Sequence, residues 1–265
     1  MKCRFINTDF MDCYANMAID EAILHYCKVP VLRVYGWKPR AISIGYNQDM
    51  QEINLENCRN NGINIVRRIT GGKAIFHDKE ITYSFILPEN TDLLPFEINE
   101  SYKTIANALV LAFEKFGIEA EVRKVPERIK TAICFNSSNW YELLVNNKKI
   151  SGSAQRRVFG KMLQHGSILM DFDYEKNNLL FNSNNLIDNI NNLKKRITSI
   201  KKEIGKEIDY KEFANAIKYG FKENFGFDIL DDSLSKEEII LAEKLRKEKY
   251  LSDEWNYKLV RENLI

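Results

Sequence analysis

The segment from residue 63 to residue 87 constrains the fold most, because strand-like runs flank a glycine turn there. Residues 63–66 form a short apolar run. After the turn, Ile75-Phe76 and residues 82–87 are again rich in branched and aromatic side chains, as is typical of strands. The turn itself reads Arg-Arg-Ile-Thr-Gly-Gly, residues 67–72. A chain with this segment is expected to contain a sheet, with the turn at the end of one strand.

The composition of this turn suits the binding of an anion or an acyl carbonyl group. Glycine lacks a Cβ, so backbone N–H groups can approach a ligand closely, and the two guanidinium groups supply charge and hydrogen bonds. An ordinary hairpin turn with two solvated arginines explains the same six residues equally well. The turn becomes informative only together with a second motif.

Composition and charge exclude several classes of protein. The chain has 265 residues, of which 45% are hydrophobic and 29% charged, as in ordinary globular proteins. A net charge of +2 argues against a dedicated nucleic-acid-binding protein. No apolar run approaches the ~20 residues that span a bilayer, and the N-terminus lacks the apolar region of a signal peptide. We therefore expect a cytoplasmic protein with no membrane partner.

Five cysteines, at positions 3, 13, 27, 58 and 134, form no recognisable framework. Their number is odd, no two of them are spaced as in a CxxC motif, and no histidine accompanies them at metal-ligand spacing. We expect neither a disulfide scaffold nor a metal site.

The sequence pattern predicts helices along the whole chain and strands mainly in its first two thirds. Helices are expected over 14–28, 98–116, 209–225 and 235–249, the last opened by a capping box at Ser235 and Glu238. Two hairpins are expected, one joining 31–37 to 41–46 and one joining 141–145 to 148–155 through Asn146-Asn147, with a further strand over 162–171.

The composition changes beyond residue 173, where an Asn-rich stretch and a basic run replace the strand-like pattern. The simplest partition is a core domain over residues 1–205 and a helical C-terminal extension over 206–265 that packs on it. Trp255 is expected to dock on the core, because leaving an indole exposed in water is costly.

The second motif lies between Cys134 and Gln155. Cys134 precedes a polar loop, and the hairpin that follows carries Lys148 and Lys149 in its turn. A lysine near a thiol lowers its pKa, and the same lysine can stabilise the oxyanion of a tetrahedral intermediate. Lys149 is the better candidate, with Lys148 expected on the opposite face. A buried, unreactive thiol and a solvated lysine remain the simpler explanation of each residue alone.

The strand that follows Lys149 carries small residues, Ser151 to Ala154. Small side chains on a strand usually mean that a ligand or another backbone lies close. Gly152 and Ala154 are therefore candidate binding positions.

Together, the two motifs resemble those of the lipoate–protein ligase and octanoyltransferase superfamily, whose catalytic fold is shared with biotin protein ligases. RRITGGKAIFH is followed about seventy residues later by KKISGSAQ. The resemblance implies an α+β fold: a mixed, largely antiparallel sheet flanked by helices, with a small second sheet. The resemblance extends over nearly the whole chain, so the core domain over 1–205 is expected to be the catalytic domain. It also implies that Lys149 contacts the acyl carboxylate or thioester carbonyl. The substrate-binding residues that it implies are Arg68, Thr70, Gly71, Gly72, His77, Gly152 and Ala154.

Within that superfamily the chain is similar to the cysteine-dependent octanoyltransferases of Gram-positive type. ICFNSSNWYELL and LQHGSILM carry this similarity, and Lys73 stands where ligases usually have a third glycine. The resemblance implies protein lipoylation, in which Cys134 takes an octanoyl or lipoyl group from acyl carrier protein as a thioester. The group then passes to a lysine of a lipoyl domain, such as that of the glycine-cleavage H protein. No cofactor is needed on this route.

Three alternatives stay open at this point. An ATP-dependent lipoate–protein ligase would use ATP and Mg²⁺ and form an acyl-adenylate. A lipoyl amidotransferase would move the group between lipoyl domains. A lipoyl- or biotinyl-binding module would lack catalysis altogether.

Overall fold

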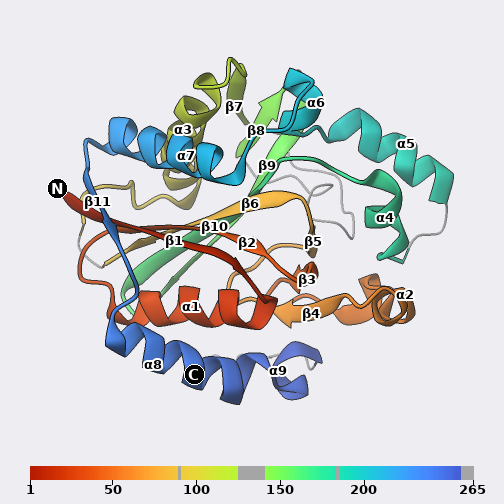
Figure 1. Cartoon of the computed structure of the whole chain (residues 1–265), viewed down its shortest axis with the longest axis horizontal. Coiled ribbons are helices and arrows are strands. Elements are labelled where there is room, and N and C mark those ends of the chain that lie inside the picture. Colours follow the sequence, from red (N-terminus) through yellow and green to blue (C-terminus); the bar gives the residue numbers. More distant parts are fainter. Residues whose placement is uncertain (89–90, 125–140, 183–185, 258–265) are drawn as a thin grey trace.

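The computed structural model describes residues 1–88, 91–124, 141–182 and 186–257, and it forms a sheet covered by helices on both faces (Figure 1). The strands are β1 (Lys2–Met11), β2 (Val31–Trp37), β3 (Ala41–Ile44), β4 (Asn64–Arg67), β5 (Ile75–His77), β6 (Glu80–Leu87), β7 (Ala120–Lys124), β8 (Tyr141–Val145), β9 (Lys148–Val158), β10 (Lys161–Leu169) and β11 (Asp228–Asp232). The α-helices are α1 (Cys13–Tyr26), α2 (Leu55–Asn60), α3 (Ile98–Glu114), α4 (Tyr174–Leu179), α5 (Leu186–Arg196), α6 (Ile200–Ile204), α7 (Tyr210–Phe225), α8 (Lys236–Leu245) and α9 (Asp253–Tyr257). A 3₁₀ turn, η1 (Met50–Glu52), precedes α2, and a π-helical turn, η3 (Arg246–Tyr250), follows α8.

The large sheet has eight strands in the order β11-β1-β2-β6-β10-β9-β8-β7, and the small sheet has three in the order β4-β3-β5. In the large sheet, β1 runs parallel to β2 and β11, and the other neighbours are antiparallel. The expected fold class, a largely antiparallel sheet flanked by helices with a small second sheet, is confirmed.

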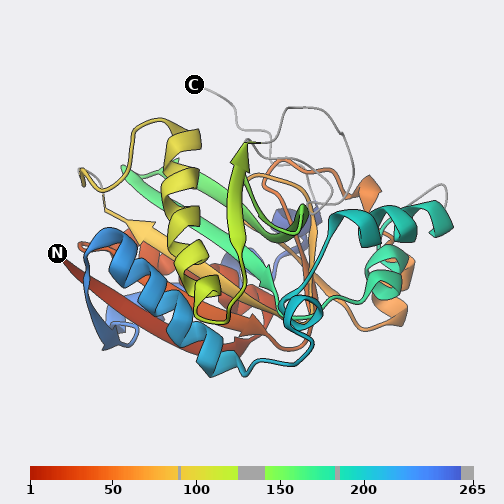
Figure 2. The ribbon, with the colours of Figure 1, turned by 90° about the horizontal axis from the view of Figure 1, so that it is seen from above.

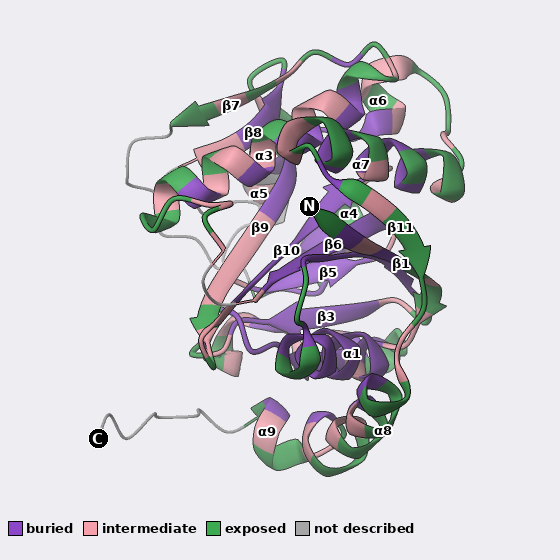
Figure 3. Ribbon diagram, turned by 90° about the vertical axis from the view of Figure 1, so that its left-hand side faces the viewer, coloured by how far each residue is buried: buried purple, intermediate pink, exposed green. Residues whose placement is uncertain are grey.

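Two hydrophobic layers cover the two faces of the large sheet. One lies between the sheet and the pair α3 and α7, which lie side by side (Figure 2). Phe113 and Phe213 are fully buried in it. The other lies between the sheet and α1, with α8 packed behind that helix (Figure 3). The apolar faces of α3 and α7, from which the helices were predicted, therefore both pack into the first layer.

The second expected hairpin is confirmed, and the first is wrong. Asn146 and Asn147 have φ of 49° and 61°, the left-handed conformation that a tight hairpin turn requires and that asparagine tolerates. In contrast, β2 belongs to the large sheet and β3 to the small one. Both runs are buried along their whole length, and an apolar run without alternation does not reveal its pairing partner.

The region from residue 206, expected to be a helical extension, contributes α7, α8 and α9 and also a strand, β11. This strand pairs with β1 at the edge of the large sheet. Its sequence, DILDD, is acidic and mostly exposed, so it lacks the apolar alternation that marks a strand. In the described ranges, no helix combines the length and apolar character that crossing a membrane requires.

Candidate active site

The two arginines at the end of β4 have different environments. The Arg68 guanidinium donates to the carbonyl of Gly71 at 2.7 Å and to that of Lys73 at 2.8 Å, and it contacts the carbonyl and hydroxyl of Ser43 at 3.1 Å. The glycine turn is thus folded around Arg68. Arg67 instead contacts backbone carbonyls of residues 45–48 and does not line the cavity described next.

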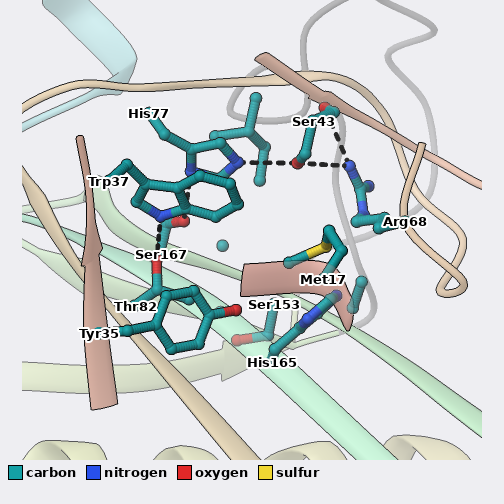
Figure 4. A pocket seen from close by; sticks show the side chains of 14 residues that line it. Met17, Tyr35, Trp37, Ser43, Arg68, His77, Thr82, Ser153, His165 and Ser167 are labelled. Atoms are coloured by element: carbon teal, nitrogen blue, oxygen red, sulfur yellow. Dashed lines mark hydrogen bonds between the residues drawn. The ribbon is translucent and has the colours of Figure 1, made fainter. Parts of the chain in front are cut away.

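A cavity with about 320 Å³ of empty space, part of it open to solvent, lies beside this turn (Figure 4). Of the residues predicted to bind substrate, Arg68, His77, Gly152 and Ala154 line it. The remaining lining residues are Met17, Tyr35, Trp37, Ser43, Ile75, Thr82, Ser153, His165, Gly166 and Ser167. The structure therefore brings together parts of both sequence motifs, from the turn after β4 and from β9.

His77 is held firmly in the cavity wall. Its ring stacks on that of Trp37 (Figure 4), and the two centroids are 3.7 Å apart. Its Nδ1 lies 2.6 Å from Glu80 Oε1, and its Nε2 lies 2.7 Å from Ser43 Oγ, which also contacts Arg68. This network fixes the orientation of both basic groups before any ligand arrives.

His165 is a site residue that the motif analysis did not single out. Burial, offset in part by Asp20, lowers its pKa, so the ring is neutral at pH 7. Its Nδ1–H donates a hydrogen bond to Asp20 Oδ2 at 3.1 Å, and its Nε2 lies 2.6 Å from Thr70 Oγ1. Thr70 therefore does not line the cavity but ties the glycine turn to α1 and β10 through His165.

Gly71 and Gly72 line a second, open cleft of about 790 Å³. Lys73 lies there too, and its Nζ is 2.7 Å from Glu52 Oε1. Gly72 has φ of +89°, a conformation that favours glycine. An added Cβ on Gly45 would lie 1.9 Å from the Gly72 carbonyl oxygen, so the turn and the segment after β3 are in close contact.

Lys149 is buried, with 3% of its side chain exposed, and its Nζ lies 2.9 Å from Glu142 Oε1. It pairs with Leu144, whereas Ser151 pairs with Leu143, so one extra residue, Ile150, interrupts the ladder. Residues paired directly across two strands share a face. The extra residue therefore places Lys149 on the same face of β9 as Gly152.

Lys149 also lines a cavity of about 360 Å³ that shares Gly152 and Ser153 with the first one. Lys148 is directed elsewhere, with its Nζ 3.0 Å from the carbonyl of Lys194. Cys134 lies outside the described residues.

The other four cysteines are all buried. Burial raises the pKa of Cys3 and Cys13 to about 12 and that of Cys27 and Cys58 to about 11. Since the thiolate is the nucleophile, these four thiols are unreactive at neutral pH. Within the described ranges, no group of three or more His, Cys, Asp or Glu side chains is arranged to hold a metal ion.

Comparisons with known proteins identify the family of this chain. A family model described as "Lipoyl protein ligase A/B catalytic domain" matches residues 12–222. The chain is 39% identical to octanoyltransferase LipM of Brevibacillus brevis and 36% identical to that of Bacillus subtilis, with 96% of this chain and 98% of each relative covered.

Two solved structures share the fold along the whole molecule. The first is a bi-partite lipoate protein ligase from Thermoplasma acidophilum, with a TM-score of 0.82, 25% identity and 100% of both chains covered. The second is a lipoate-protein ligase A bound with ATP, with a TM-score of 0.83, 25% identity, and 98% of this chain and 100% of the other covered. The chain belongs to the lipoyl protein ligase A/B catalytic domain family.

Proposed function

We propose that this chain is an octanoyltransferase of protein lipoylation that works through a thioester on Cys134. The donor is octanoyl–acyl carrier protein, and the acceptor is a lysine of a lipoyl domain such as that of the glycine-cleavage H protein. One observation carries the proposal: β9 holds both small residues that line the cavity and a buried lysine, in a chain similar to octanoyltransferases over nearly its full length.

In the first step, the Cys134 thiolate attacks the thioester carbonyl of the donor. A carbon–sulfur bond to Cys134 forms, the bond to the carrier's thiol breaks, and that thiol leaves after taking up a proton. Lys149 stabilises the oxyanion between these events, because a cation in a water-poor site acts strongly on developing charge. The cavity holds the acyl chain, and at ~0.8 kcal/mol per buried methylene it contributes several kcal/mol of binding.

In the second step, the amine of the acceptor lysine attacks the acyl group on Cys134. An amide bond forms, the carbon–sulfur bond breaks, the amine loses a proton, and the Cys134 thiolate is restored. The thioester already carries the activation free energy, so this route needs neither ATP nor a metal ion. The Lys73–Glu52 ion pair supports this choice over a ligase, because it occupies the cleft beside the glycine turn.

The test is the mass of the intact protein after mixing with octanoyl–acyl carrier protein in the absence of ATP. We expect an added octanoyl group on the parent and none on Cys134→Ala, followed by loss of the adduct when a lipoyl domain is supplied. An adduct on both proteins would place the acyl group elsewhere. Acylation of the lipoyl domain only with ATP and free lipoate would make the chain a ligase.

Basic side chains can steer an acidic carrier protein to its site, and three of them lie near the end of β9 and the start of β10. In the structure Arg156 donates to the Ile69 carbonyl at 2.8 Å, Arg157 to that of Phe96 at 2.6 Å, and Lys161 to that of His25 at 2.5 Å. Each of them therefore supports a neighbouring segment. A carbonyl group has no net charge, so these contacts leave the three positive charges in place, and steering of the carrier protein by them stays a prediction.

Replacing Gly45 with alanine should impair acyl transfer by displacing the glycine turn. The added Cβ meets backbone, the Gly72 carbonyl, which cannot rotate away as a side chain could. Because a misplacement of about 1 Å can cost on the order of 100-fold, we expect kcat/KM for the octanoyl donor to fall by about 10- to 100-fold. Steady-state kinetics with octanoyl–acyl carrier protein as the varied substrate measure this value of kcat/KM.

Gly220→Ala is the matched control. Its Cβ would lie 2.0 Å from the carbonyl oxygen of Ala108, a similarly close contact with backbone. Gly220 lies on α7, which contributes no residue to the cavity beside the glycine turn. Equal losses of kcat/KM in the two variants would mean that Gly45 acts only through stability.

A further inference from the structure

Arg67 is fully buried, and backbone oxygen atoms surround its guanidinium group. Its Nη1 donates to the carbonyls of Gly45, Tyr46 and Gln48 at 2.8 to 2.9 Å. Its Nε donates to the carbonyl of Trp255 at 3.0 Å, and its Nη2 to that of Asn256 at 3.1 Å. One guanidinium group therefore joins the segment after β3 to the C-terminal segment. A buried charge tolerates such a site only while its hydrogen bonds are complete.

The same C-terminal residues also bind the backbone of Arg67. Its N–H donates to Asn256 Oδ1 at 2.9 Å, and its carbonyl accepts from Trp255 Nε1 at 2.8 Å. Asn256 is itself fixed, since its Nδ2 donates to the Tyr250 carbonyl at 2.7 Å. The docking of Trp255 expected from the sequence is confirmed, and α9 lies beside the end of β4 (Figure 1).

The contacts continue from Arg67 into the glycine turn. The N–H of Tyr46 donates to the Thr70 carbonyl at 2.9 Å, and the N–H of Arg68 donates to the Ile44 carbonyl at 3.0 Å. The close approach of Gly45 to Gly72 leaves no space between the two segments. Any shift of Arg67 therefore moves the segment against which the glycine turn packs.

We propose that Asn256 and Trp255 are positioning residues for the acyl site and act on the glycine turn through Arg67. That the site binds an acyl ligand rests on the proposed function. The structural link from Asn256 and Trp255 through Arg67 to the glycine turn does not. The C-terminal segment then does more than pack on the core. It determines the position of Arg68 and the glycine turn relative to the cavity. Losing its contacts should weaken donor binding more than it slows chemistry.

Asn256→Ala tests the link because it removes the acceptor of the Arg67 N–H. We expect KM for the octanoyl donor to rise about tenfold, because one buried hydrogen bond is lost. We expect kcat to change less than about threefold and KM for the lipoyl domain to stay constant, because the acceptor does not occupy the cavity. Amide hydrogen exchange over residues 68–73 should become faster. Asn256→Asp, which keeps an oxygen acceptor, should restore part of the donor affinity.

Arg246→Ala is the matched control. Arg246 Nη2 lies 3.0 Å from Asp12 Oδ2, so this ion pair docks the same C-terminal region without touching Arg67. We expect a lower Tm with unchanged donor KM and unchanged exchange over 68–73. If Asn256→Ala lowers Tm in the same way and leaves KM and exchange unchanged, Asn256 is only structural and the proposal is overturned.

Two further measurements ensure that the proposal is either supported or overturned. Trp255→Phe removes the donor to the Arg67 carbonyl but keeps an aromatic ring, and it replaces Asn256→Ala if that variant does not fold. If the parent protein transfers no octanoyl group, the proposed function fails. The exchange comparison between Asn256→Ala and Arg246→Ala still decides the positioning role, because it needs no substrate.

Discussion

Lys149→Met should lower the rate of acyl-enzyme formation by about 10²- to 10³-fold, the usual effect of removing one oxyanion-stabilising group. The side chain is buried at 3% exposure on the face of β9 that carries Gly152. Methionine keeps the length and apolar stem of lysine but brings no charge to the carbonyl oxygen. The rate is measured as growth of the octanoyl adduct by rapid-quench mass spectrometry. Binding of the donor should change much less than the rate.

Lys148→Met is the natural control, because it removes the same charge one residue away. Lys148 contacts the Lys194 carbonyl and turns away from the site, so we expect less than a twofold effect on the rate. Lys149→Met also leaves Glu142 without its ion-pair partner, so both variants are assayed well below their Tm. Similar rates in the two variants would remove Lys149 from the chemistry.

The position of Lys149 shows how far sequence reasoning reaches. Strand alternation correctly separates Lys148 from Lys149, and Asn146-Asn147 correctly predicts the turn, because both depend on local backbone geometry. Alternation alone would also put Lys149 and Gly152 on opposite faces. The extra residue Ile150 reverses this, and a bulge has no sequence signature strong enough to predict it here.

The hydrogen bonds around His165 show a second limit of prediction from the sequence. Asp20, Thr70 and His165 come from α1, the glycine turn and β10, and no spacing in the sequence relates them. His165 lies within the LQHGSILM segment, which by itself assigns the ring no role. Asp20 is buried on α1 but lies beside the apolar stripe that includes Ala18, Ala22 and Ile23, so the sequence pattern does not indicate a buried partner for it. Only the folded sheet shows which partner it has.

The family resemblance, in contrast, depended on order and separation of two motifs and proved reliable for the fold. Both motifs meet at one cavity because β9 and the turn after β4 converge there. The residues between 125 and 140, which include Cys134, are outside the described ranges, so its distance from Lys149 stays a prediction. The adduct experiment bears on it directly.

Arg33→Met should destabilise the folded protein by about 3–5 kcal/mol, the usual cost of leaving a buried charge without its partner. Arg33 Nη1 lies 2.6 Å from Asp20 Oδ1, and the two side chains are 0% and 2% exposed. Asp20 also accepts from the Tyr35 hydroxyl and from His165, so the loss should reach the cavity wall. Urea unfolding at pH 7 measures the free energy of unfolding. Lys79→Met, which breaks an exposed ion pair with Asp171, should cost no more than about 1 kcal/mol.

The pH dependence of this difference identifies its cause. Burial alone would raise the pKa of Asp20, but the charge of Arg33 and the contact with His165 hold it below its usual value. In the parent, this stabilisation is complete above the unfolded pKa of about 3.9 and is lost as pH falls through the lower folded value. Without Arg33, burial dominates, the folded pKa lies above the unfolded one, and protonation relieves the cost. The deficit of Arg33→Met should therefore be largest near pH 7 and shrink as pH falls toward 4. A deficit that is constant from pH 7 to 4 would trace the loss to packing of the Arg33 side chain, because packing does not titrate.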